Sequence, residues 1–365
     1  MGLAGYYPLA KDKHITLQRI SATFFTFIAL SYLILGIIFC IKNLSNLGLL
    51  SEACAFLLTE VTLIVKMFNF FYYKRNFLLM EEMLRSPLFT EVDAEEENIL
   101  KENLKTSKIV EILTIIQVLV NISVETLYAL FEKKLFLLMW FPFDPAEHFY
   151  AVYFFELIAC FSGATLAVTI DVLLVYLLDL CAVQCTLLKH RLIKVGATFT
   201  GDEAVDDRVR IEKLEKYTIH HDEIYSFAGL VESSFSMGTF VQIVCSSVII
   251  CFCLFKTLIT PLKSIEFGML VAYSYDMLWQ LVLYCYFGQK VVNASETITE
   301  ACYMSNWYNC SLKVQKHLLM IMNRANTSVV VTAGGLFPLT LEMLMAILST
   351  AYSFFTLIWK VYNDA

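Results

Sequence analysis

The feature that most constrains this chain is a series of apolar stretches, each long enough to cross a lipid bilayer. A hydrocarbon core of about 30 Å requires about 20 apolar residues in a helix. Hydrophobic residues make up 58% of the chain, above the roughly 45–50% of soluble proteins. The sequence therefore predicts an all-α membrane protein, a single domain over residues 1–365 with seven transmembrane helices. The predicted spans are residues 20–41, 47–73, 109–131, 149–188, 225–255, 265–287 and 340–360.

Lysine and arginine residues predict the orientation of these spans. Twenty of the 27 basic residues lie in residues 1–19, 74–108, 189–216 and 288–328. Cytoplasmic loops carry the excess of positive charge in membrane proteins. We therefore expect a cytoplasmic N-terminus and an extracellular C-terminus, which is opposite to a G-protein-coupled receptor. The stretch at 149–188 would be about 60 Å long as a helix, so we also expect a helical cytoplasmic anchor layer.

Several classes of function lack support in the sequence. There is no metalloprotease, nucleophile-elbow or phosphate-loop motif, so neither catalytic residues nor metal or cofactor ligands are expected. The net charge of −7 comes without a basic stripe, which argues against binding of nucleic acid. Four cysteines lie near the predicted outer face, and spacing alone leaves open whether they form disulfides. They are Cys40, Cys54, Cys251 and Cys253.

Acidic residues interrupt the predicted spans. Each carboxyl costs roughly 2.5–3.5 kcal/mol at mid-membrane, so each is expected to face protein or water. They either draw cations toward a conduction path or form hydrogen bonds between helices, and both interpretations stay open. An acidic run at 93–97 is expected to be a solvated loop face. The residues within the spans are Glu52, Glu60, Glu125, Glu156, Asp171, Glu232, Asp276 and Glu342.

The segment before the last span cannot form a regular helix, because it contains Gly334, Gly335 and Pro338. Irregular backbone at membrane depth is tolerated only where protein buries it or water reaches it. The segment is thus either a broken helix beside an aqueous pathway or a bend leading into the final span.

One face of the last span carries a distinct pattern. Ala346, Thr350, Ser353, Leu357 and Val361 recur at helical spacing and share that face. The face is small or weakly polar as far as Ser353 and apolar at Leu357 and Val361. It suits a pore wall closed by a hydrophobic constriction, and it suits ordinary helix packing equally well.

Candidate ligand-binding residues lie in the outer halves of four spans. A ligand site needs concavity, an apolar lining and a few polar groups. A packed core explains the same aromatic residues equally well. The candidates are Phe56, Thr59, Val118, Ile122, Phe154, Ile158, Phe161 and Tyr273.

Several linked motifs resemble the insect odorant receptor family. Their order and separation match that family along the whole chain, most strongly over the last 85 residues. Gustatory-type chemoreceptor channels are the nearest alternative, but their chains usually end differently. The motifs are 140–144 (WFPFD), 232–235 (ESSF), 283–289 (LYCYFGQ), 307–308 (WY), 319–325 (LMIMNRA), 336–342 (LFPLTLE) and 352–356 (YSFFT).

The resemblance implies a subunit of a ligand-gated, non-selective cation channel. Members of this family bind small volatile odorants and assemble as tetramers with a shared co-receptor in the plasma membrane lipid of olfactory neurons. The seventh spans would line the pore, with Ser353 on the wall and a gate at Leu357 and Val361. Subunits would meet at the cytoplasmic layer, around Trp307, Tyr308 and Arg324. No cofactor is implied.

The resemblance also bears on the ligand pocket and the broken segment. It places the pocket among spans two, three, four and six, where the eight candidates lie. Asp276 stands where an aromatic residue is expected, so Tyr275 would take its place. Gly334 and Gly335 would form a hinge rather than a midplane break. Less favoured functions are a G-protein-coupled receptor and an ion-coupled carrier that uses Glu60, Asp171 or Asp276.

Overall fold

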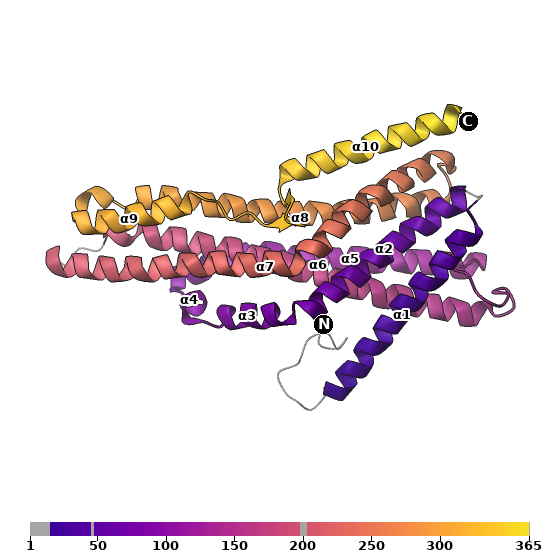
Figure 1. The fold of residues 1–365 in the computed structure, drawn as a ribbon, viewed down its shortest axis with the longest axis horizontal. Coiled ribbons are helices and arrows are strands. Elements are labelled where there is room, and N and C mark those ends of the chain that lie inside the picture. The colour runs from indigo at the N-terminus through magenta and orange to yellow at the C-terminus, as the bar shows by residue number, and fades with distance from the viewer. Residues whose placement is uncertain (1–14, 45–46, 198–202, 365) are drawn as a thin grey trace.

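The computed structural model describes residues 15–44, 47–197 and 203–364, which form an elongated bundle of helices (Figure 1). The prediction of an all-α membrane fold is confirmed. Its helices are α1 (Ile15–Lys42), α2 (Leu47–Tyr72), α3 (Lys74–Leu84), α4 (Pro87–Thr90), α5 (Ala94–Glu132), α6 (Phe149–Ile193), η2 (Val195–Ala197), α7 (Glu203–Ile259), α8 (Ile265–Tyr303), η3 (Trp307–Asn309), α9 (Leu312–Ala325) and α10 (Leu341–Asp364). Two short strands, β1 (Thr332–Ala333) and β2 (Phe337–Pro338), complete it.

Five helices in the described ranges are long and apolar enough to cross a membrane, namely α1, α2, α5, α6 and α7. α10 contributes a shorter apolar segment at Leu341–Leu357. α8 is less apolar because Asp276, Gln280 and several tyrosines lie in its first half. The bounds of the seven predicted spans and the side that faces the cytoplasm therefore stay predictions.

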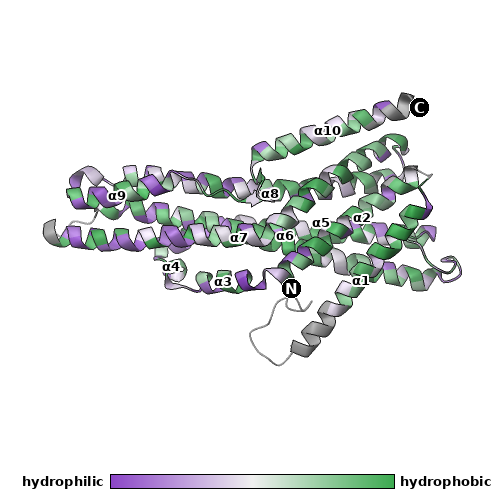
Figure 2. Ribbon diagram, viewed as in Figure 1, coloured by the Kyte–Doolittle hydropathy of each residue, from purple (hydrophilic) through white to green (hydrophobic). Residues whose placement is uncertain are grey.

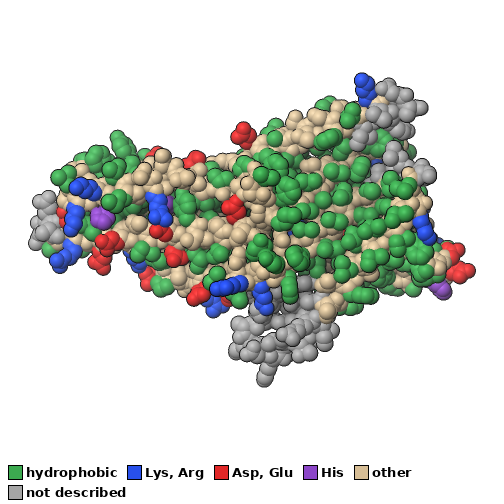
Figure 3. Space-filling model, viewed as in Figure 1, with side chains coloured by type: hydrophobic (Ala, Val, Ile, Leu, Met, Phe, Trp, Pro, Cys, Tyr) green, Lys and Arg blue, Asp and Glu red, His purple; other side chains and the backbone are tan. Residues whose placement is uncertain are grey.

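The bundle has two halves of different surface character. We call the half with α3, α4 and α9 the α9 half, and the half with the loops at 133–148 and 260–264 the loop half. Hydrophilic residues gather in the α9 half, while the loop half is apolar (Figure 2). Its space-filling surface is mostly hydrophobic, with charges near its far end (Figure 3). The loop half thus suits a bilayer, and α7, which is about 85 Å long with its 57 residues, extends well beyond it.

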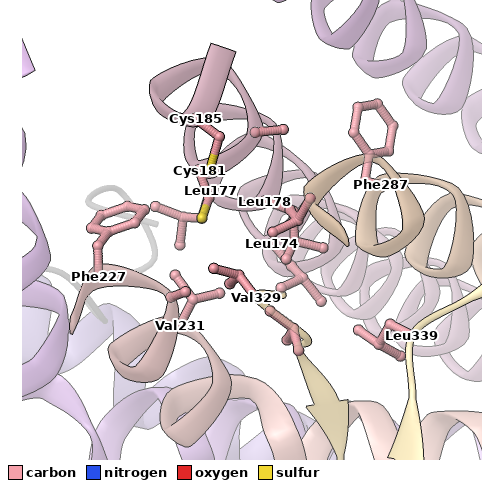
Figure 4. Close-up of a cluster of buried hydrophobic side chains, with 14 of the residues drawn as sticks. Leu174, Leu177, Leu178, Cys181, Cys185, Phe227, Val231, Phe287, Val329 and Leu339 are labelled. Atoms are coloured by element: carbon pink, nitrogen blue, oxygen red, sulfur yellow. The ribbon is translucent and has the colours of Figure 1, made fainter. Parts of the chain in front are cut away.

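The main hydrophobic core lies in the α9 half, between α6, α7 and α8. Leu178, Leu188 and Phe227 are fully buried there, since their exposure is 0%. Side chains of α6 and α7 converge with Val329 and Leu339 of the segments that flank the two strands (Figure 4). This packing holds the long helices together where they extend beyond the apolar loop half.

The segment before α10 is a β-hairpin, which the sequence analysis did not predict. β1 pairs antiparallel with β2, and Gly334 and Gly335 form the turn with φ of +64° and +67°. Glycine adopts this left-handed conformation without steric cost. The Gly334 amide donates to the Ser236 carbonyl at 3.0 Å, and the Thr332 amide donates to Glu232 at 3.1 Å. The hairpin therefore docks on α7 instead of lining an open break.

The acidic run at 93–97 starts α5 instead of forming a loop, and it is solvent-exposed as expected except at Glu96, which is buried. Asp93 and Glu96 form a capping box at the helix N-terminus. Glu96 also accepts two hydrogen bonds of 2.8 Å from Arg191 of α6. Burial raises the pKa of Glu96, but the bonds from Arg191 and the Asp93 amide outweigh it and lower the pKa overall. The run thereby joins α5 to α6 in the α9 half.

Candidate functional site

The loop half contains a cavity of about 160 Å³ between α1, α2, α5, α6 and α8. An apolar cavity of about 150 Å³ is large enough to hold benzene. The walls are mostly apolar and include aromatic residues from α1, α2 and α8. The cavity therefore has the size and the lining of a site for a small organic ligand.

Five of the eight predicted ligand-binding residues line this cavity. They are Phe56, Thr59, Val118, Ile122 and Tyr273. The Thr59 and Tyr273 hydroxyl oxygens lie 2.5 Å apart and share a hydrogen bond. The Phe56 and Tyr273 rings also contact each other, with centroids 5.5 Å apart. The structure thus brings α2 and α8 together through an aromatic pair and a hydroxyl pair on the cavity wall.

The three candidates on α6 do not line the cavity. Phe154 and Ile158 are 57% and 49% exposed on the outside of the bundle, and Phe161 lies on the same helical stripe. The α6 wall consists instead of small residues, among them Ala159, Ser162 and Gly163. Our sequence interpretation chose the aromatic face of α6, whereas small side chains on the neighbouring face leave the space empty.

Three acidic residues line the cavity, and of these the sequence had placed only Asp276 at a pocket position. They are Glu60, Glu125 and Asp276. Helical spacing was the available signal, because Glu60 adjoins Thr59 and Glu125 lies one turn beyond Ile122. Asp276 accepts hydrogen bonds from the side-chain amides of Gln117 and Asn121 on α5. These bonds tie α5 to α8 at the cavity wall.

Tyr275 does not take the place of the expected aromatic residue. It is 51% exposed and stacks on Trp279 with centroids 6.2 Å apart, away from the cavity. Asp276 is the residue that faces the cavity at this position. The expectation for Tyr275 is therefore wrong.

A second cavity of about 190 Å³ adjoins the first and shares Phe56, Glu125 and Tyr273 with it. It extends toward the loops, past an ion pair between Lys256 of α7 and Glu52 of α2. The two cavities therefore lie on either side of the same three side chains, and the second is the nearer to the loops.

The predicted pore face of α10 is uncovered in the single chain. Leu344, Ile347 and Ala351 are buried on one side of the helix, which packs on α7 and α8. Ser353 and Leu357 are exposed on another side, Leu357 by 58%. Val361 lies on α10, outside the residues whose side chains the structure describes. Figure 1 shows α10 diverging from the other helices after the hairpin.

The predicted subunit-contact residues lie at the surface of the α9 half. Trp307 and Tyr308 are 37% and 65% exposed, next to the exposed Leu312. Arg324 forms an ion pair of 2.7 Å with Asp222 of α7. These residues form an apolar surface with charged neighbours.

A buried ion pair lies between the cavity and the main core. Lys66 of α2 contacts Asp171 of α6 at 2.6 Å, and Tyr284 of α8 donates a hydrogen bond of 2.5 Å to the same carboxylate oxygen. All three residues are at most 5% exposed. The acidic residue at this depth therefore joins helices, which is one of the two interpretations left open by the sequence.

All eleven cysteines, including Cys40, Cys54, Cys251 and Cys253, are free thiols. Among the residues that the structure describes, no group of three or more His, Cys, Asp or Glu side chains is arranged to hold a metal ion.

Comparison with known proteins points to a single family. The family described as 7tm Odorant receptor matches residues 46–352. Odorant receptor Or2 of Anopheles gambiae is 27% identical over 186 residues, which are 50% of this chain and 48% of that protein. Odorant receptor 94a of Drosophila melanogaster is 24% identical over 355 residues, covering 93% of this chain and 86% of that protein. The chain thus matches about half the length of Or2 and most of 94a.

The fold is shared with a solved olfactory receptor. The structure of the insect olfactory receptor OR5 from Machilis hrabei in complex with eugenol superposes with a TM-score of 0.85 at 16% sequence identity. The alignment covers 97% of this chain and 93% of that chain. At this identity the likeness concerns the arrangement of the helices.

Proposed function

This chain belongs to the insect odorant receptor family, and we propose that it is the odorant-binding subunit of a ligand-gated, non-selective cation channel. Family membership makes it a multi-pass membrane receptor and not an enzyme. The observation that carries the proposal is the mostly apolar cavity in the loop half, formed by the helices on which the sequence had placed a ligand pocket.

The ligand would be a small volatile organic molecule. A volume of about 160 Å³ accommodates one ring or a short chain. The related OR5 was solved with eugenol, which is a one-ring phenol. Phe56 and Tyr273 supply aromatic contacts, and Thr59 supplies a hydroxyl group. The adjoining cavity toward the loops gives the ligand a route of entry.

The gate would be formed by α10. Its exposed face carries Ser353 and Leu357, which would face the pore axis when four subunits come together. Leu357 is apolar and lies near the end of the helix, where it would exclude water from the closed pore.

Helix α8 offers a physical connection between ligand and gate. It contributes Tyr273 and Met277 to the cavity, and Gly288 further along it lies against Leu339, just before α10. A ligand shifts gating only through its different affinity for the open and closed arrangements. A small displacement of α8 on binding would supply that difference.

The partner would be a co-receptor subunit in a tetramer at the plasma membrane of olfactory neurons. The apolar surface around Trp307 and Tyr308 in the α9 half is suited to such a contact, because aromatic residues are enriched at protein interfaces. Channel activity would require both kinds of subunit.

The proposal is tested by voltage clamp of cells that express this chain with and without an insect co-receptor. We expect odorants to evoke a cation current only when both subunits are present. Absence of any odorant-evoked current, with both subunits at the cell surface, would contradict the proposal.

Substitution of the gate residue is the sharper test. Leu357→Ser should raise the basal current several-fold in the assembled channel, because a polar side chain allows water into the constriction. Met345→Ser is the matched control, since Met345 is similarly exposed on α10 but lies near the other end of the helix. An equal rise of the basal current in both variants, or no rise in either, would mean that Leu357 is not the gate residue.

A further inference from the structure

Two carboxyl groups on the cavity wall have no hydrogen-bonding or ion-pair partner among the residues that the structure describes. Glu60 lies on α2 and Glu125 on α5, and both line the cavity. In the part of the chain that the structure describes, neither side chain has a hydrogen bond or an ion pair. Both are half-buried, so that they remain accessible from the cavity.

The other acidic residues within the predicted spans, apart from the solvent-exposed Glu342, are supplied with donors. Asp276 receives hydrogen bonds from Gln117 and Asn121, although it lines the same cavity. Asp171 is paired with Lys66, and Glu52 is paired with Lys256. Glu156 accepts a hydrogen bond of 3.2 Å from the Phe136 amide. Glu60 and Glu125 therefore differ from these residues, because no described side chain or backbone amide donates a hydrogen bond to them.

The cavity as a whole favours positive charge. Of the described residues that line it, three are acidic and none is Lys or Arg. Acidic groups in a cleft with apolar walls concentrate the field and attract cations. The rings of Phe56 and Tyr273 add to this preference, because the face of an aromatic ring attracts a cation. A carboxylate ligand would meet repulsion in the same space.

We propose that the ligand is a small apolar amine, whose ammonium group is held by the carboxylates of Glu60 and Glu125. This inference rests on the proposed function, because it names the ligand class for the same cavity. An ammonium group offers up to three donors and no acceptor, which matches two carboxylates that lack donors. The hydrocarbon part of the amine would pack on Phe56, Ile122 and Met277.

Four compounds of nearly equal shape separate the contributions of charge and hydrogen bonding. They are 2-phenylethylamine, 2-phenylethanol, phenylacetaldehyde and phenylacetate, each with one ring and a two-carbon side chain. The amine is a cationic donor at neutral pH, the alcohol is a neutral donor, the aldehyde only accepts, and the acid is an anion. We expect sensitivity of the odorant-evoked current to fall in that order. An alcohol or aldehyde response equal to or stronger than the amine response would overturn the inference.

Isosteric substitutions locate the effect. Glu60→Gln and Glu125→Gln remove charge and keep volume, so each should lower sensitivity to the amine at least about tenfold, the fold-change expected for a charge-assisted hydrogen bond. The aldehyde response should not fall, because glutamine adds an N–H donor for a ligand that only accepts. Surface labelling verifies that the variants fold and reach the membrane. Glu147→Gln in the exposed 133–148 loop is the matched control and should leave every response unchanged. Unchanged amine sensitivity in both cavity variants would contradict the proposal.

A binding measurement distinguishes failure of the inference from failure of the proposed function. The thermal midpoint of the purified chain should rise with 2-phenylethylamine and not with phenylacetate, because a ligand stabilises the state that it binds. Stabilisation by the amine without any current would contradict the channel proposal and keep the inference. Currents evoked by other odorants, with no stabilisation or response to amines, would overturn the inference and keep the channel.

Discussion

The two halves of the bundle differ in how completely they are packed, although the same helices run through both. In α6, residues 170–192 are mostly buried, whereas few residues before 170 are. In α8, every buried residue lies at or after Met277. The α9 half is thus packed like a protein interior, and the loop half keeps empty space between its helices.

This difference indicates a division of roles within single helices. One large core fills the α9 half and continues along α7 as far as Cys253, while the rest of the loop half has two small clusters, around Tyr32 and around Leu63. An empty cavity costs stability, because the side chains around it lose contacts. The dense packing of the α9 half offsets that cost and leaves the loop half free to bind a ligand. Variants that disturb one half and not the other test this interpretation.

The largest effect is expected at Gly288 of α8, and Gly268 near the start of the same helix provides the comparison. A Cβ at Gly288 would lie 2.2 Å from the Leu339 carbonyl oxygen, and that atom belongs to the backbone. A Cβ at Gly268 would meet nothing within 4 Å. Gly288→Ala should therefore displace the segment that leads into α10 and greatly reduce the folded receptor, measured by thermal unfolding in detergent and by surface expression.

Gly268→Ala is the matched control on the same helix. Alanine in a helix is more stable than glycine by roughly 0.5–1 kcal/mol, so this variant should unfold at the same temperature or slightly above. A thermal midpoint lowered equally by both substitutions would mean that the halves do not differ in packing along α8.

The next largest effect is expected at the border between the halves, where Lys66, Asp171 and Tyr284 meet. Asp171→Leu leaves the Lys66 ammonium buried without its carboxylate, and breaking a buried pair in this way costs about 3–5 kcal/mol. The double substitution Lys66→Met and Asp171→Leu removes both charges and should recover most of that loss. The measurement is the thermal midpoint of each purified variant. Equal destabilisation by the single and double variants would mean that the charges are not coupled.

The features that the sequence predicted correctly are those that depend on the residues of one stretch of the chain. Apolar stretches gave the helical membrane fold, and the motifs gave the family, which the comparisons confirm. Position in the outer halves of the spans, together with the family resemblance, selected Phe56, Thr59, Val118 and Ile122, which line the cavity. These features follow from residue type and spacing along one element.

The features that were missed depend on contacts between elements. Phe154 and Ile158 are apolar on a helix that is apolar on every side, so the sequence could not tell which face of α6 points inward. Strands of two residues, such as β1 and β2, are too short to produce an alternating pattern. The pairing of Lys66 with Asp171 joins residues 105 positions apart. Tertiary packing decides each of these.

The smallest of the three effects concerns pH and should arise in the α9 half. His220 lies on α7 before the predicted span, is fully buried, and has its Nε2 atom 3.0 Å from the Gln184 side-chain oxygen. Burial is the main cause that lowers the pKa of His220 to about 4; Arg191, His221 and Lys216 act in the same direction, and Glu96 opposes them. The neutral ring is therefore the form that fits the folded protein.

The sign of the pH dependence follows from this lowered pKa. Between about pH 6.5 and pH 4 the unfolded chain binds a proton at His220 that the folded chain does not, so stability falls as the pH decreases through this interval. The loss approaches about 3 kcal/mol near pH 4 and then levels off for this group. In His220→Asn, the thermal midpoint of the purified chain should depend less on pH in that interval. An unchanged slope would mean that acid acts elsewhere, for instance on His221, whose pKa is also lowered by burial. Because His220 packs against Phe89 and α6 in the dense half, a flattened slope would place the acid-sensitive step in the scaffold and not in the ligand cavity.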